Sequence, residues 1–371
     1  MRIGIDARPI QGKFTGDATY WRGLIEGFSH IDTDDEIILY LDAGLPIPAI
    51  PQAKYFQAKP LRSMSWRTWS VFAFPRALKK DGIDIAHVQY SIPLYAPCPV
   101  VTSVHDISFK RHPEFFRLKD RLILDAGFKR ASKRAAKILA LSEYTKKEML
   151  DLYDIRPEKI AVVYPGVDEQ FKPMDRDICR ATIADKYGVS SPFILTLGVI
   201  QPRKNLPRLL EGFAKLKEAD KSAPDLVIVG KYGWKETNLL ERIAELKLSE
   251  HVILTGYAPQ EDLPVFYNAA DVFIYPSVYE GFGLPPLEAM ACGTPVITGN
   301  QTSLPEVIGE AGIMVGPYDP AAFTKALVNV LSNETLRAEM SSKGLKQASK
   351  FTWDKTATQV LEIYRRELRS A

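Results

Sequence analysis

The sequence predicts an α/β protein built from two parallel sheets with helices on their faces. The chain has 371 residues, enough for about two domains of ordinary size. Short apolar runs rich in β-branched residues alternate with longer amphipathic segments, which is typical of strand–helix–strand units. About a dozen strand-like runs are too many for one compact doubly wound sheet. We therefore expect two sheets, each in its own domain.

The predicted strands fall into two groups along the chain. The strands of the first half are expected at Arg2–Asp6, Ile37–Leu41, Ile83–Gln89, Val100–His105, Lys137–Leu141 and Ile160–Tyr164. Those of the second half are expected at Phe193–Gly198, Leu226–Gly230, Val252–Gly256, Val272–Tyr275, Pro295–Thr298 and Ile313–Val315. Many of these runs are almost continuously apolar, as expected of parallel strands that helices cover on both faces.

The boundary between the domains is expected within residues 164–193, where prolines, a glycine and a short charged helix interrupt the strand pattern. We place residues 1–180 in the N-terminal domain and residues 181–353 in the C-terminal domain. Residues 354–371 have the pattern of a strongly amphipathic helix with no strand after it. We expect this last helix to pack back onto the N-terminal domain.

The composition excludes several classes of function. The formal net charge of +3 is too small to indicate nucleic-acid binding, but it suits a protein that handles anionic phosphates. The three cysteines, Cys98, Cys179 and Cys292, are widely spaced and indicate neither a disulfide framework nor a zinc site. No apolar run approaches ~20 residues, and the N-terminus lacks the features of a signal peptide. We therefore expect a soluble cytoplasmic protein.

A glycine-containing loop in the second half predicts an anion site. The apolar strand before the loop ends at Pro276, and Pro285 and Pro286 open the helix after it. Unpaired N–H groups and partial positive charge at a helix start attract anions, and glycines allow the backbone to come close to a ligand. The main-chain donors that we expect to face a bound anion are those of Gly281, Phe282, Gly283, Leu284 and Leu287.

Two carboxylates bracket this loop, Glu280 before it and Glu288 in the first helical turn. A carboxylate repels phosphate, so we expect both groups to accept hydrogen bonds from hydroxyls. One would serve a ribose diol and the other a sugar ring. The alternative is that Glu288 only complements the helix dipole and that Glu280 is solvated.

A second loop carries two adjacent cations, Arg203 and Lys204, after a strand that ends at Gly198. Open parallel sheets bind their ligands at the carboxyl ends of the strands. An arginine forks onto a diphosphate and a lysine adds a point charge, so this pair suits a leaving nucleoside diphosphate. The alternative is an exposed pair of cations on a turn.

Together these motifs resemble those of the retaining family 4 glycosyltransferases. The resemblance implies the GT-B fold, in which two Rossmann-like parallel-sheet domains face a central cleft. It covers nearly the whole chain and is strongest from Phe193 to Pro317. The motifs that carry it are Glu280-x7-Glu288 with its Gly-Phe-Gly-Leu-Pro loop, Gly198 through Asn205, Tyr164–Asp168, Val104–Asp106, Leu141–Tyr144 and Thr294–Ile297.

The resemblance implies a role for each matching side chain of the second domain. Glu280 would contact the donor sugar near its C3 and C4 hydroxyls, and Glu288 would hold the ribose. Arg203 and Lys204 would grip the diphosphate. The catalytic residues implied in this way are His105, Arg203, Lys204 and Glu280.

The first domain is expected to contribute a histidine and a loop. His105 would face the donor sugar near its C6 hydroxyl; the alternative is a core histidine at the end of a strand. Asp106 would either orient the imidazole or cap the following turn. The family's first loop has two glycines, spaced by one residue, that face the diphosphate. Gly16 matches the first of them, but Ala18 stands at the second, where a methyl group would crowd a close approach of the backbone.

Main-chain groups and a tyrosine complete the implied donor site. Gly256 and Tyr257 would lie near the nucleobase, and the loop amides would contact sugar and phosphates. The donor-binding residues implied by the resemblance are Gly16, Gly198, Gly256, Tyr257, Gly281, Phe282, Gly283, Leu284 and Glu288.

The implied reaction moves a hexose from a nucleotide diphosphate sugar, with UDP-glucose and GDP-mannose favoured, to a hydroxyl of a saccharide or lipid-linked glycan in polysaccharide biosynthesis. It would retain the anomeric configuration through an ion-pair-like front-face route, without a metal ion or cofactor. The Asp-x-Asp at Asp32–Asp34 precedes a strand and is interpreted as a solvated turn. The alternatives are a non-catalytic nucleotide-sugar binding protein and a nucleotide-sugar epimerase.

Two stretches of the first domain bear on the acceptor. Phe128–Lys137 carries several cations and no acid, which suits either an anionic membrane surface or a solvated helix face. Arg62–Trp69 mixes aromatic side chains with cations, a combination that suits sugar faces, a lipid interface or a core. Peripheral membrane contact through the N-terminal domain is therefore one interpretation, and neither stretch identifies the acceptor.

Overall fold

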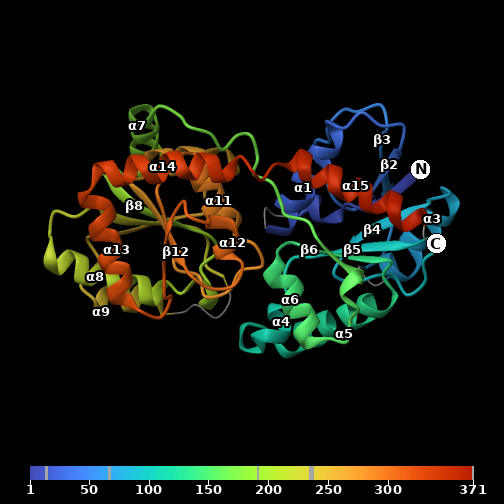
Figure 1. Ribbon diagram of the computed structural model, residues 1–371, viewed down its shortest axis with the longest axis horizontal. Helices are drawn as coiled ribbons and strands as arrows, with labels where there is room; N and C mark the ends of the chain where they lie inside the picture. The colour runs from blue at the N-terminus through green and yellow to red at the C-terminus, as the bar shows by residue number, and fades with distance from the viewer. Residues whose placement is uncertain (13–15, 66–67, 190–191, 234–237, 370–371) are drawn as a thin grey trace. The chain divides into compact units, whose positions relative to one another are not determined.

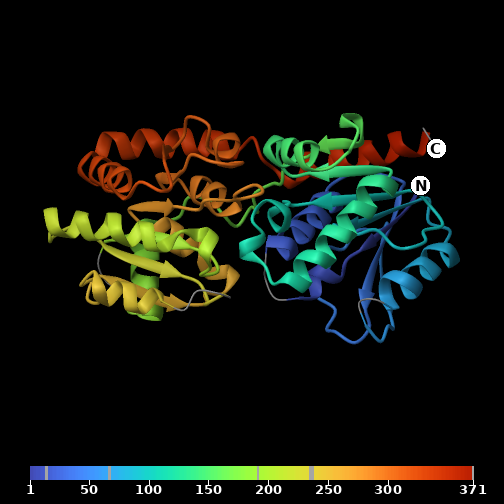
Figure 2. The same ribbon diagram turned by 90° about the horizontal axis from the view of Figure 1, so that it is seen from below.

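The computed structural model describes the chain except for residues 13–15, 66–67, 190–191, 234–237 and 370–371. It divides into two compact units, Met1–Gly166 with Phe351–Ala371, and Val167–Lys350. Each unit holds one parallel sheet with helices on both faces (Figures 1 and 2). The predicted α/β class with two Rossmann-like parallel-sheet domains is confirmed.

The sheet of the first unit has the strand order β3-β2-β1-β4-β5-β6-β7, with every neighbouring pair parallel. The strands are β1 (Arg2–Asp6), β2 (Glu36–Asp42), β3 (Phe56–Leu61), β4 (Ile85–Gln89), β5 (Val100–Val104), β6 (Lys137–Ala140) and β7 (Ile160–Val162). The direction in which strands are added reverses between β1 and β4, where Ile3 pairs with both Ile37 and Ile85. The sequence analysis missed β3, because this partly exposed edge strand contains Pro60 and lacks an apolar run.

Helices lie on both faces of this first sheet. The helices are α1 (Gly16–Ser29), α3 (Phe74–Lys80), α4 (Ser108–Arg111), α5 (Leu118–Arg134), α6 (Glu143–Leu152) and α15 (Trp353–Arg369). The C-terminal helix α15 packs along α1 (Figure 1). A Cβ on Gly23 would lie 1.9 Å from the Trp353 ring, and one on Gly27 would lie 2.3 Å from the Trp353 carbonyl oxygen. The two glycines of α1 therefore allow the start of α15 to come into backbone contact.

The sheet of the second unit has the order β10-β9-β8-β11-β12-β13 and is also parallel throughout. Its strands are β8 (Phe193–Leu197), β9 (Asp225–Val229), β10 (Val252–Gly256), β11 (Val272–Tyr275), β12 (Val296–Gly299) and β13 (Ile313–Val315). Its helices are α7 (Arg176–Tyr187), α8 (Leu206–Ala219), α9 (Leu239–Glu245), α10 (Leu263–Ala269), α11 (Leu284–Ala291), α12 (Leu304–Ile308), α13 (Pro320–Ser332) and α14 (Glu334–Ala348). The order of strand addition reverses here between β8 and β11.

The structure places the change between units at residues 166 and 167, earlier than residue 180 of the sequence analysis. The reason is that α7 packs on α10 in the second unit. Arg176 and Arg180 of α7 both pair with the Asp271 carboxylate, at 2.5 and 3.0 Å. The chain re-enters the first unit at Phe351, slightly before residue 354, where the sequence analysis placed the last helix, because Trp353 packs on α1.

Among the helices of the described residues, none combines the length and the apolar character that crossing a bilayer requires.

We predict that Gly23→Ala destabilises the first unit by about 3 kcal/mol, because the new methyl group forces α15 away from α1. Urea unfolding at 25 °C, followed by tryptophan fluorescence, measures the change. Gly16→Ala is the matched control in the same helix, since no atom lies within 4 Å of its Cβ position. Equal unfolding midpoints for Gly23→Ala and the unmodified chain would contradict the close packing of the two helices.

Candidate functional site

The candidate site of the second unit lies at the carboxyl ends of β8 and β11, on either side of the point where the strand order reverses. These strands are hydrogen-bonded neighbours, with Ile194 paired with Val272. The chain after β8 passes through a short 3-10 turn at Pro202–Lys204 before α8, and the chain after β11 forms the loop that leads into α11. The topology thus brings the two predicted loops to one edge of the sheet, where open α/β sheets bind ligands.

Glu280 lies between the two predicted cations. Its Oε2 is 2.6 Å from Arg203 Nη1, and its Oε1 is 2.7 Å from Lys204 Nζ. The hydroxyls of Ser277 and Tyr275 also donate to Oε1, at 2.6 and 2.8 Å. Burial opposes ionisation of Glu280, but the charges of Arg203 and Lys204 outweigh it and lower its pKa to about 2. The carboxylate is therefore charged at every physiological pH and has several hydrogen-bond donors.

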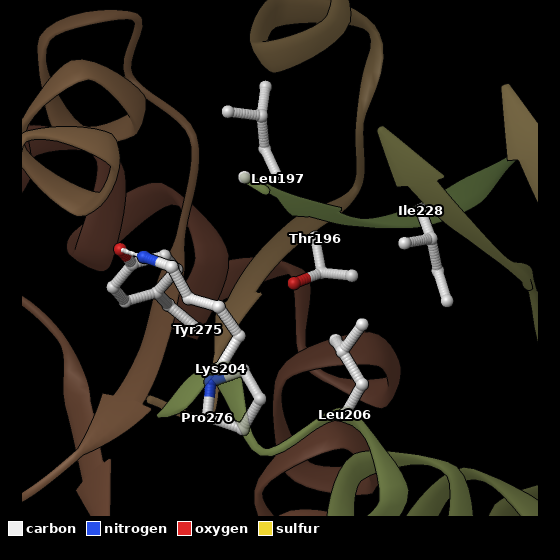
Figure 3. A pocket seen from close by; sticks show the side chains of 8 residues that line it. Thr196, Leu197, Lys204, Leu206, Ile228, Tyr275 and Pro276 are labelled. Carbon is white, nitrogen blue, oxygen red and sulfur yellow. Dashed lines mark hydrogen bonds between the residues drawn. The ribbon is translucent and has the colours of Figure 1, made fainter. Parts of the chain in front are cut away.

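Lys204 is buried rather than displayed on a turn, with 8% of the residue exposed. Its ammonium contacts the Tyr275 hydroxyl and lies 4.4 Å from the centre of the Tyr275 ring. Figure 3 shows the two side chains pointing toward one another beside a small pocket that Thr196, Leu206 and Ile228 help to line. Burial and then repulsion by Arg203 lower the pKa of Lys204 to about 8, although Glu280 acts against them.

Further hydrogen bonds tie the two loops together. The Arg203 carbonyl accepts from the Val278 amide at 2.9 Å, and the Ser277 hydroxyl lies 3.0 Å from the same carbonyl oxygen. The Arg203 guanidinium in turn donates to the Tyr279 carbonyl at 3.1 Å. Asn205 has φ of 57°, and its side-chain amide donates to the Pro276 carbonyl at 3.1 Å. The cations are therefore held by backbone contacts as well as by charge.

Glu288 lies inside α11 and is also buried, so it does not merely complement the helix dipole in solvent. Its Oε2 accepts a hydrogen bond of 2.9 Å from the Tyr267 hydroxyl. Burial raises the pKa of Glu288 to about 7, with the hydrogen bond from Tyr267 acting against it and the charge of Asp168 acting with it. The two glutamates thus have opposite electrostatic surroundings at the two ends of one loop.

Glycine backbones line the same edge. Gly198, Gly230 and Gly256 follow β8 and β9 or end β10, and all have positive φ angles. A Cβ on Gly230 would lie 1.9 Å from the Gly198 carbonyl oxygen, so only glycine fits there. Tyr257, after Gly256, is 56% exposed. The predicted Gly198, Gly256 and Tyr257 are thus gathered at the edge that carries the cations.

The loop before α11 has the conformation of a helix start. Gly283 has φ of 111° and directly precedes α11, and a Cβ on it would approach the Leu304 side chain to 2.8 Å. Gly281 and Phe282 are buried, and Leu284 is the first helical residue. The Ser303 hydroxyl lies 2.9 Å from the Glu280 carbonyl and 2.8 Å from the Phe282 carbonyl, which holds the loop in place.

His105 lies in the first unit, just after β5, and pairs with a residue that the sequence analysis did not consider. Its Nδ1 is 2.9 Å from Asp17 Oδ1 in the first turn of α1. Its Nε2 is buried and has no hydrogen-bond partner among the described residues. Asp106 caps the following turn instead, accepting from the Ser108 amide at 2.8 Å and the Ser108 hydroxyl at 2.5 Å. Asp17 therefore orients the imidazole.

The structure thus distributes the predicted site between the units. Arg203, Lys204 and Glu280 meet in the second unit, whereas His105 and Gly16 belong to the first. Gly16 begins α1 and Ala18 is buried in its first turn, while Lys13–Thr15 of the predicted loop lie outside the described residues. The side chains that the sequence analysis missed are Asp17, Tyr267, Tyr275, Ser277 and Ser303.

Two family profiles match the chain. Glycosyltransferase Family 4 matches residues 34–171, and Glycosyl transferases group 1 matches residues 182–347. The O-antigen chain mannosyltransferase B of Escherichia coli is 33% identical over 386 aligned positions, which cover 98% of this chain and 100% of that protein. The serotype-specific mannosyltransferase WbdA of the same species is 34% identical over 64% of this chain but only 30% of its own length.

Solved structures share the fold. A sucrose-phosphate synthase from Thermosynechococcus elongatus superposes with a TM-score of 0.80 over 100% of both chains, at 20% identity. Anabaena HepE in complex with UDP-glucose superposes with a TM-score of 0.75 over 99% of this chain and 100% of its own, at 18% identity. At such identities the likeness supports the fold alone.

We predict that nucleoside diphosphate affinity falls above about pH 8, by up to tenfold per pH unit, because Lys204 loses its charge as the pH rises through its pKa of about 8. Calorimetric titration of GDP and UDP between pH 6.5 and 9.5, at ~0.1 M salt, measures this loss. Lys204→Arg should abolish the decline, since arginine stays protonated. Lys215 is exposed on α8, so the control variant Lys215→Arg should show the same decline in affinity as the unmodified chain. If the affinity of Lys204→Arg still declined above pH 8, a titrating group other than Lys204 would be its cause.

We also predict that Glu280→Gln binds a nucleoside diphosphate several-fold more tightly but transfers sugar about 100-fold more slowly. The neutral amide leaves the charges of Arg203 and Lys204 free for phosphate, yet it removes the carboxylate proposed to hold the sugar. Binding calorimetry and initial rates measure the two effects. The control is Glu211→Gln, which alters a carboxylate that also pairs with two arginines but lies on α8 outside the site. Parallel loss of binding and transfer would contradict this division of roles.

Proposed function

This chain belongs to the family 4, group 1 glycosyltransferases, and on that premise we propose that it transfers mannose from GDP-mannose to a hydroxyl of a saccharide or lipid-linked glycan. The proposed reaction retains the anomeric configuration, needs no metal ion and serves polysaccharide synthesis in the cytoplasm. The full-length similarity to an O-antigen chain mannosyltransferase supports mannose over glucose. The likeness to a UDP-glucose complex is too distant to support that donor.

The observation that carries the proposal is the meeting of Arg203, Lys204 and Glu280 at one sheet edge. Two cations beside a carboxylate match a donor that has a diphosphate beside a hydroxyl-bearing ring. In the proposed step the bond between the anomeric carbon and the diphosphate oxygen breaks, and the leaving nucleoside diphosphate keeps the electron pair. The cations stabilise the charge that develops on it.

The acceptor oxygen then bonds to the anomeric carbon on the face that the diphosphate has left. Its proton passes to the oxygen of the leaving phosphate, so no carboxylate nucleophile is required. His105 is proposed to bind a sugar hydroxyl through Nε2, because Asp17 already holds Nδ1. A lipid-linked acceptor would bring the protein to a membrane surface, and the basic side chains of α5 support such peripheral contact.

A thermal-shift panel of GDP, UDP, ADP and their common sugar conjugates tests the donor. GDP and GDP-mannose should raise the melting temperature, since a ligand at 100 times its Kd stabilises the folded state by about 2.7 kcal/mol. The shift should persist in EDTA, disappear in Glu288→Ala and remain in the exposed Glu250→Ala. A shift from uridine nucleotides only would overturn the choice of GDP-mannose, and no shift at all would overturn the donor site.

Measuring turnover distinguishes a glycosyltransferase from an epimerase and from a non-catalytic binding protein. Incubation with GDP-mannose and a mannoside acceptor should give an α-linked product, which the one-bond coupling between C1 and H1 in the NMR spectrum identifies. A β-linked product would overturn retention. Conversion of GDP-mannose to another nucleotide sugar without acceptor would indicate an epimerase, and binding without turnover over an acceptor panel would indicate a non-catalytic protein.

A further inference from the structure

A chain of buried polar side chains crosses the core of the first unit. His87 of β4 lies at its centre and is fully buried. The Nδ1 atom of His87 contacts the Tyr364 hydroxyl of α15, and its Nε2 atom lies 2.8 Å from the Ser103 hydroxyl of β5. The Ser103 hydroxyl in turn lies 2.8 Å from the Tyr20 hydroxyl of α1. The chain therefore joins the C-terminal helix to α1 through two neighbouring strands of the sheet.

The His87 imidazole is suited to joining two hydroxyls. Burial, and then the positive charge of His105, lower the pKa of His87 to about 3. The ring is therefore neutral at physiological pH, so one of its nitrogens donates and the other accepts. All four groups of the chain are fully buried, and a buried polar group that loses its partner costs free energy. The four groups thus hold one another in fixed places.

The α1 end of the chain lies against His105. The ring centres of Tyr20 and His105 are 4.8 Å apart in an edge-to-face arrangement, with 64° between the ring planes. Three residues earlier on α1, the Asp17 carboxylate pairs with His105 Nδ1 at 2.9 Å. Residues three apart lie on one face of a helix, so α1 holds the imidazole with two side chains. The orientation of His105 therefore depends on the position of α1.

The other end of the chain lies on the helix that packs along α1. The ring centre of Trp353, at the start of α15, is 5.8 Å from that of Tyr20. Tyr364 lies about three turns further along α15, and its ring centre is 6.2 Å from that of Phe28 in α1. Apolar packing is non-directional, whereas hydrogen bonds have narrow ranges of distance and angle. The polar chain therefore fixes the position of α1 more closely than packing alone would.

We propose that the C-terminal helix positions His105 for the transfer reaction through this chain, with Tyr364, His87, Ser103 and Tyr20 as positioning residues. Because all four are fully buried, they act through α1 rather than by contact with a ligand. The inference rests on the proposed function, in which His105 binds a hydroxyl of the donor sugar. The alternative is that the chain only stabilises the first unit.

Initial-rate kinetics of Tyr364→Phe, which removes one oxygen and keeps the ring, test the proposal. We expect kcat to fall about fivefold while the KM for GDP-mannose changes less than about twofold, because a small misplacement of His105 slows the reaction and the second unit still binds the diphosphate. If His105→Gln transferred sugar slowly but Tyr364→Phe kept the kcat of the unmodified chain, the proposal would be overturned.

Tyr40→Phe is the matched control. Tyr40 is also fully buried in the first unit, and its hydroxyl donates to Asp81 at 2.7 Å, away from the chain. Urea unfolding should show that both variants lose stability, but Tyr40→Phe should keep the kcat of the unmodified chain. An equal loss of kcat in the two variants would indicate a general effect of stability and would overturn the positioning role.

A double-mutant cycle distinguishes a connected chain from separate packing effects. Ser103→Ala interrupts the chain closer to His105, so adding Tyr364→Phe to it should cause no further fall in kcat. If the two substitutions multiplied their separate losses, Tyr364 would not act through Ser103 and the proposal would be wrong.

Nitrogen NMR of the imidazole rings, recorded without ligand, separates this inference from the proposed function. The chain has five histidines, and the His105→Gln variant identifies the signals of His105. Tyr364→Phe should displace these signals, whereas Tyr40→Phe should not. Unchanged His105 signals in Tyr364→Phe would overturn this inference. Displaced signals, together with undiminished transfer by His105→Gln, would overturn the proposed role of His105 in the reaction but not its positioning by α15.

Discussion

The ion cluster of buried Glu280 and Lys204 with partly exposed Arg203 is the constraint on which the geometry of the second unit's loops depends. A charge taken out of water needs a partner, and removing one member of a buried pair typically costs about 3–5 kcal/mol. The loops after β8 and β11 must therefore keep these three side chains together, and the contacts of Ser277 and Val278 with the Arg203 carbonyl reinforce this arrangement. A diphosphate bound as proposed would compete with the carboxylate for the same two cations, so donor entry would require this cluster to rearrange.

The sheets of the two units share one topological feature, a reversal of strand order, but carry different residues at that point. In each sheet the reversal of strand order opens a position at the carboxyl edge. The second unit has charged side chains and glycine backbones at this position, whereas the first has a cavity that Asp6, Arg8, Asp17 and several apolar side chains line. Surroundings rather than residue type set the protonation of the two glutamates, since cations lower the pKa of Glu280 and burial raises that of Glu288.

The sequence alone predicts the fold class, most strands and the residues of the Glu280 loop, because those signals are local. Alternating apolar runs report strands, and a glycine loop before a proline-started helix reports its own conformation. Pairing between distant segments leaves no such signal, so Asp17 as the partner of His105 and Tyr267 as the partner of Glu288 came only from the structure. The edge strand β3 and the cavity of the first unit were missed for related reasons. Strand β3 is half-exposed, and the cavity is lined by residues from several separate segments of the chain.

The return of the chain to the first unit has a consequence for biosynthesis. The first unit is left at Gly166 and completed only by Phe351–Ala371, so the whole second unit is an insertion within it. During translation the face of α1 that carries Gly23 and Gly27 emerges long before Trp353, its packing partner. The second unit is one continuous segment of the chain, so it can fold on the ribosome before the last helix of the first unit has been synthesised. A chain that ended before Trp353 would therefore contain every residue of the charged cluster but leave the face of α1 that carries Gly23 and Gly27 uncovered.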